Sequence, residues 1–105
     1  MTDTDEKTAS LLAAIWQRNR ALVEERLTLL DRAAAAAAVD ALSDSLRQEA
    51  CGAAHKLAGS LGMYGYDEGT RIARQIEVLL GDATPDPARL GALVVGLRRA
   101  IFPVA

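Results

Sequence analysis

The stretch that decides the fold also contains the only histidine of the chain, and it reads Ala53-Ala54-His55-Lys56-Leu57-Ala58-Gly59-Ser60-Leu61-Gly62. Apolar residues recur in it and before it at the spacing of an amphipathic helix. The stripe that this helix is expected to bury comprises Leu46, Ala50, Ala54, Leu57 and Leu61. At roughly 100° per residue, His55 falls on the opposite side of the helix and faces water.

Small residues are predicted to surround His55 on this exposed side. Residues three and four apart are neighbours on a helix surface, and those around the imidazole are Cys51, Gly52, Ala58, Gly59 and Gly62. A glycine in a helix interior costs roughly 1 kcal/mol relative to alanine. The glycines therefore indicate that a large partner approaches the imidazole closely. The alternative interpretation is an ordinary solvated histidine.

The composition of the 105 residues predicts a single helical domain. The chain has 21 alanines and 15 leucines but only four aromatic residues, which is typical of close-packed helices. We therefore expect residues 1–105 to form one domain with one core, with residues 1–7 flexible. The net charge of −2 and the absence of a basic cluster argue against nucleic-acid binding.

Targeting and redox signals are also absent from the sequence. No apolar run is long enough to cross a membrane. The acidic start lacks the order of a signal peptide, and the single Cys51 has no partner for a disulfide or a metal site. These features predict a cytoplasmic protein without a metal site, and the initial methionine favours a free-standing one.

Four helical stretches follow from the apolar periodicity and from the residues at their ends. The predicted helices are Thr8–Ala38, Asp44–Tyr64, Asp67–Leu80 and one that opens at Asp86-Pro87 and reaches Ile101. Short connections between four helices predict an all-α, up-down-up-down four-helix bundle with a long first helix. That first helix is long enough to project beyond the bundle or to bend between Trp16 and Arg20.

The residues from Ala54 to Tyr66 resemble the signature of histidine-containing phosphotransfer (HPt) domains. In that pattern an apolar residue, a glycine and small residues follow the histidine, and a second glycine precedes an aromatic residue. The matching residues are Leu57, Gly59, Ser60, Gly65 and Tyr66. The resemblance implies an HPt-like bundle that accepts and donates a phosphoryl group on His55.

The partners implied by the resemblance are response-regulator receiver domains and a hybrid histidine kinase. The chain itself is then a phosphoryl carrier rather than an enzyme. It has no phosphate-binding loop, no kinase signature and no acidic cluster for Mg²⁺. The receiver is therefore expected to supply an aspartate, Mg²⁺ and a lysine. Gly52, Ala58, Gly59 and Gly62 are the residues expected to admit it.

Glu77 stands 22 positions after His55, where some family members place the group that holds the imidazole. A carboxylate that accepts from one ring nitrogen would fix the tautomer and direction of the ring. The alternative for Glu77 is an i,i+3 pair with Arg74 on the same helix.

The family's usual lysine, three residues after the histidine, is Ala58 in this chain. Lys56 and Arg74 are therefore the candidate charge partners of a phosphoryl group, and Lys56 lies about 100° around the helix from His55. The missing lysine leaves open an interaction module that binds partners without phosphotransfer. We expect a monomer, with a dimer paired through the first helices as the alternative.

Overall fold

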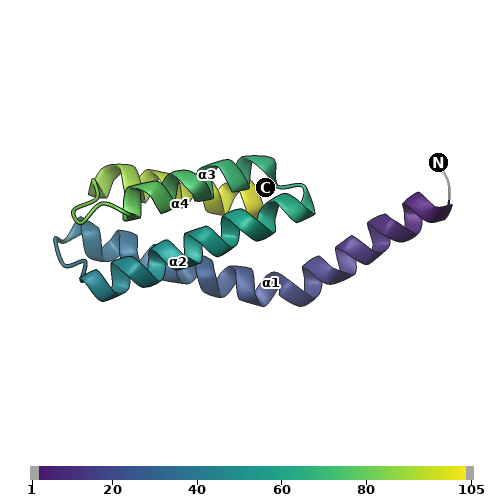
Figure 1. Cartoon of the computed structure of the whole chain (residues 1–105), viewed down its shortest axis with the longest axis horizontal. Helices are drawn as coiled ribbons and strands as arrows, with labels where there is room; N and C mark the ends of the chain where they lie inside the picture. The colour runs from purple at the N-terminus through teal and green to yellow at the C-terminus, as the bar shows by residue number, and fades with distance from the viewer. Residues whose placement is uncertain (1–2, 104–105) are drawn as a thin grey trace.

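The computed structural model of the chain describes residues 3–103. Its elements are α1 (Asp3–Ala38), α2 (Asp44–Leu61), the 3-10 turn η1 (Gly62–Tyr64), α3 (Asp67–Leu80) and α4 (Pro87–Ile101). Helix α2 packs against α1 and α3, and α4 packs against α3 and α1, which closes the bundle. The predicted all-α architecture with a long first helix is thus confirmed (Figure 1).

The N-terminal turns of α1 project from the bundle as an arm (Figure 1). The helix is unbroken from Asp3 to Ala38, so it begins before the predicted start at Thr8. Residues 4–14 of the arm are exposed, whereas the buried residues of α1 begin at Val23. Of the two predicted shapes for the first helix, the structure has the projecting one.

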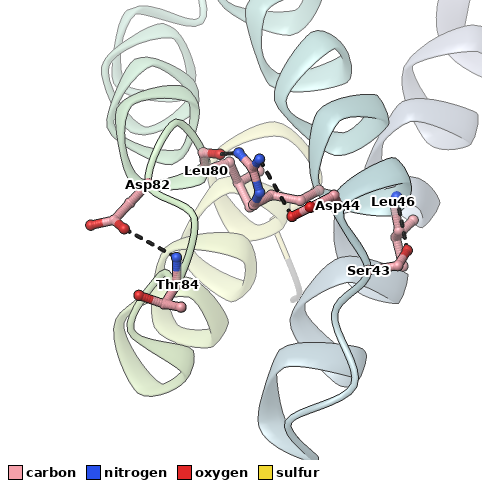
Figure 2. Close-up of polar contacts among 7 residues, drawn as sticks. Ser43, Asp44, Leu46, Leu80, Asp82 and Thr84 are labelled. Carbon is pink, nitrogen blue, oxygen red and sulfur yellow. Dashed lines mark hydrogen bonds and ion pairs between the residues drawn. The ribbon is translucent and has the colours of Figure 1, made fainter.

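Local side chains define the helix ends much as the sequence predicts. The Ser43 hydroxyl accepts a hydrogen bond from the Leu46 amide at 3.1 Å, which satisfies one free donor at the start of α2 (Figure 2). Gly65 has φ +83° after η1, a left-handed conformation that favours glycine. The last turn of the predicted second helix is tightened into η1, so α2 ends at Leu61 rather than at Tyr64.

The core is apolar throughout the described residues, and each helix contributes large side chains to it. The largest fully buried side chains are Leu27, Leu30, Leu57, Leu61, Ile76, Leu80, Leu90, Leu97 and Val23. The predicted stripe of α2 is buried from Ala50 to Leu61, with Leu46 half-buried at its start. The outer face of α2 therefore stays available for chemistry.

All four aromatic residues gather where α1 leaves the bundle. The Trp16 ring lies 5.1 Å from that of Tyr64, 5.0 Å from that of Tyr66 and 6.1 Å from that of Phe102, measured between ring centroids. The Arg20 guanidinium covers the Phe102 ring at 4.7 Å. The cluster attaches α1 to η1 and to the end of α4.

Polar contacts at the opposite end align α2 with α3. Arg47 donates a hydrogen bond to the Leu80 carbonyl at 2.8 Å and lies 3.7 Å from the Asp44 carboxylate. In the following loop, the Thr84 amide donates to the Asp82 carboxylate at 3.0 Å (Figure 2). The start of α2 is thereby tied to the end of α3, which sets the register of the two antiparallel helices.

Candidate functional site

His55 lies in the middle of α2 and meets α3 through its ring. Its Nδ1 is 2.7 Å from Oε2 of Glu77, and the side chain of His55 is 74% exposed while that of Glu77 is 33% exposed. One turn earlier on α2, the Cys51 thiol contacts the backbone carbonyl of Glu77 at 3.5 Å. The register of α2 against α3 thus places the carboxylate beside the imidazole.

The hydrogen bond indicates which ring nitrogen of His55 is left with a free lone pair. An ionised carboxylate only accepts hydrogen bonds, so Nδ1 of His55 carries the proton and donates to Glu77. In a neutral imidazole the other nitrogen, Nε2, then keeps its lone pair. The geometry presents an exposed, oriented imidazole that is able to attack an electrophile through Nε2.

A hollow of about 410 Å³ lies beside His55 on the surface between α2 and α3, and we call it the histidine hollow. Its lining residues are His55, Ala58, Gly59, Arg74, Glu77 and Val78. Lys56 instead lines a different groove between α1 and α2, together with Glu25 and Gly52. Of the two candidate charge partners, the structure brings Arg74 and not Lys56 to the hollow that contains His55.

The glycines near His55 leave open space at the surface. A Cβ added at Gly52 or at Gly59 would meet no atom within 4 Å, and a Cβ at Gly62 would lie 3.5 Å from the Thr70 hydroxyl. All three glycines are exposed. A bulky body can therefore approach this face of α2 without meeting a side chain at these positions.

The prediction that Ala58 belongs to the exposed small residues around His55 is wrong. The side chain of Ala58 is 6% exposed, and Ala53 is buried as well. The apolar face of α2 is wider than its periodicity predicts because α3 lies beside Ala58 on one flank and α1 lies beside Ala53 on the other. Ala58 still lines the histidine hollow, as part of its wall.

Of the two interpretations of Glu77, the structure has the contact with His55 and not the pair with Arg74. The carboxylate contacts His55, and among residues 3–103 Arg74 makes no ion pair or hydrogen bond. Three residues before Arg74, Arg71 instead donates from Nε to Glu68 at 3.0 Å. That hydrogen bond holds the pKa of the Glu68 carboxyl below its usual value and raises the pKa of the Arg71 guanidinium.

Comparison with protein families identifies the fold. The model of the Hpt domain family matches residues 14–101. The chain belongs to the Hpt domain family. No curated protein and no solved structure matches it. The Hpt match begins two residues before Trp16, so most of the projecting arm of α1 lies outside it.

Membership of the Hpt family defines the general activity of the chain. Hpt domains are phosphoryl carriers rather than catalysts, and they perform histidine phosphotransfer in phosphorelays with partners such as receiver domains. Across residues 3–103, no group of three potential metal ligands occurs. No helix in the same residues is long and apolar enough to span a membrane.

Val78 is the residue of this Hpt site that sequence reasoning left without a role. It follows Glu77 on α3 and lines the histidine hollow with a side chain that is 78% exposed. The amphipathic pattern of α3 predicts its exposure but not its nearness to His55. That nearness depends on how α3 lies across α2, which the pattern of one helix does not determine.

Proposed function

We propose that His55 is the phosphorylated residue of this Hpt domain and that it exchanges a phosphoryl group with aspartates of receiver domains. The observation that carries the proposal is the 2.7 Å contact between Nδ1 of His55 and the Glu77 carboxylate. It leaves Nε2 as the unprotonated nitrogen on an exposed ring, with glycines nearby that allow a partner to approach.

In the proposed transfer, Nε2 attacks the phosphorus of an aspartyl phosphate on the receiver. The P–N bond forms as the P–O bond to the aspartate breaks, and the electron pair of that bond returns to the carboxylate. Nδ1 keeps its proton and its hydrogen bond to Glu77. The Glu77 carboxylate then compensates the positive charge that the doubly substituted imidazole acquires.

The remaining needs of phosphoryl transfer are assigned to the partner and to Arg74. In-line transfer requires positioning and neutralisation of the charge on the phosphoryl oxygens. We assign Mg²⁺ and a lysine to the receiver domain. We assign to Arg74, which lines the histidine hollow, the positive charge that this chain contributes near the phosphoryl oxygens. A hybrid histidine kinase would supply the upstream receiver, and a response regulator would provide the downstream one.

Label transfer tests the assignment of His55. Purified receiver domains of the source organism are phosphorylated with ³²P and mixed with wild type, His55→Gln and the control Arg32→Gln, whose side chain is exposed on α1. We expect acid-labile, alkali-stable label on wild type and on the control but none on His55→Gln. Helicity should be equal in all three, because an exposed side chain contributes little to folding.

Two other outcomes would contradict the proposal. Label that persists on His55→Gln would move the phosphorylated residue elsewhere. Receiver binding without any transfer to wild type would instead indicate an interaction module that keeps the Hpt fold, the alternative that Ala58 in place of the family's lysine favours.

A further inference from the structure

A second groove lies between α3 and α4 beside the histidine hollow. Its lining residues are Arg71, Arg74, Gln75, Val78, Leu79 and Arg89, and we call it the arginine groove. Three of these six side chains are cationic and none is acidic. The chain as a whole has a net charge of −2, so the groove is a local excess of positive charge on an acidic protein.

Two of the three guanidinium groups have no partner among residues 3–103. Arg71 is hydrogen-bonded to Glu68, whereas Arg74 and Arg89 make no ion pair or hydrogen bond with any residue between 3 and 103. Guanidinium groups form bidentate hydrogen bonds with carboxylates, and such charge-assisted pairs are the stronger hydrogen bonds of proteins. The groove is therefore equipped to bind carboxylate side chains from another molecule.

The arginine groove is continuous with the histidine hollow. Arg74 and Val78 line both. Val78 is also 78% exposed, which leaves a large apolar side chain uncovered on the ridge between the two sites. A body that fills the histidine hollow therefore meets Val78 and Arg74, which also belong to the arginine groove.

We propose that the arginine groove docks acidic side chains of the receiver domain that exchanges its phosphoryl group with His55. This inference rests on the proposed function and adds the chemistry by which the partner is chosen. Val78 supplies an apolar contact at the centre of the interface, and Arg89 pairs with a carboxylate beyond it. Charge complementarity of this kind raises the association rate and discriminates between partners more than it raises affinity.

The net negative charge of the chain disfavours the other anionic partners. Nucleic acids and anionic membranes attract proteins through extended positive fields, and the overall charge of −2 opposes such a field. A receiver that presents a few carboxylates in one place needs only the local arginines.

The test compares two charge reversals on the same helix. Arg89→Glu alters the arginine groove, and Arg99→Glu makes the same charge change at an exposed position of α4 outside it. Receiver domains are screened for label transfer to wild type, and the fastest donor is used with all three proteins. At low salt we expect Arg89→Glu to slow the second-order transfer about 10-fold and Arg99→Glu to stay within about twofold of wild type. The defect should shrink at high ionic strength, because salt screens exposed charges.

The possible results separate this inference from the proposed function. Equal rates for Arg89→Glu and Arg99→Glu, with His55 still labelled, would overturn the docking role and leave the phosphotransfer intact. Failure of every receiver to label wild type would overturn both. Binding of wild type to single-stranded DNA or to phosphatidylserine vesicles that is lost in Arg89→Glu, while transfer is unchanged, would assign the groove to a different partner.

Discussion

Replacing Gly59 with glutamine should raise the stability of the protein while lowering its activity. A Cβ at this position meets no atom within 4 Å, so the new side chain extends into open space beside the histidine hollow. Glycine in a helix interior is less favourable than glutamine by roughly 0.5 kcal/mol. For a domain of this size, that gain corresponds to a rise of about 2–4 °C in the midpoint of thermal unfolding.

The same side chain stands one turn after His55, where the receiver has to approach. A displacement of about 1 Å between reacting groups can cost on the order of 100-fold in rate. We therefore expect label transfer from a phosphorylated receiver to fall by about that factor in Gly59→Gln. Rapid-quench transfer assays and calorimetry on the same samples measure the two effects.

Gly91 provides the matched control for this experiment. It lies inside α4, and a Cβ there also meets no atom within 4 Å. Gly91→Gln should therefore show a similar gain in stability and an unchanged transfer rate. A wild-type transfer rate in Gly59→Gln would refute the argument that the open surface admits the partner, and a loss in both variants would show that helix rigidity, not access, controls the rate.

Three further predictions concern the hydrogen bond, the charges and the oligomeric state. Glu77→Ala removes the acceptor of Nδ1, so ¹⁵N NMR should show a shift of His55 from the Nδ1–H form toward the Nε2–H form; an unchanged tautomer would contradict the role of Glu77. Ala58→Lys should speed transfer, because the aliphatic part of the new lysine can follow the wall of the histidine hollow. Arg74→Ala should slow transfer by about 10-fold, while Lys56→Ala should leave the transfer rate unchanged. Equal transfer rates in all three variants would assign the neutralising charges to the receiver alone. Analytical ultracentrifugation should give a mass near the 11.1 kDa of one chain, and a mass twice as large would favour pairing through the first helices.

Periodicity and end residues together predict all four helices, and the clearest differences are the start of α1 and the end of α2. The stripe of α2 and the stop at Gly65 are confirmed because both depend on local spacing and backbone geometry. The predicted start of α1 at Thr8 is too late, because the acidic residues Asp5 and Glu6 read as part of a flexible leader. Acidic residues are in fact favourable in the first turn of a helix, where they interact with its dipole.

The surroundings of His55 could be predicted only in part, because they belong to two helices. Periodicity places His55 and Glu77 on outward faces, but only the family resemblance suggested that they meet. Periodicity places Ala58 on the exposed side, and this prediction is wrong because the width of a buried face depends on the neighbouring helix as well as on the sequence of α2. For the same reason, only the packed bundle shows that Val78 lies near His55, and that Arg74 rather than Lys56 lines the same hollow.

The alignment of α2 with α3 links the loop end of the bundle to the protonation of the reacting ring. A change of one residue in the register of α3 against α2 would move Glu77 by about 1.5 Å along the axis and about 100° around it, and the 2.7 Å contact with Nδ1 would be lost. The bond from Arg47 to the Leu80 carbonyl opposes that change from about 12 Å along α2. In the transfer that we propose, Arg47 at one end of the bundle thus helps to keep the lone pair of His55 on Nε2, the nitrogen that attacks phosphorus.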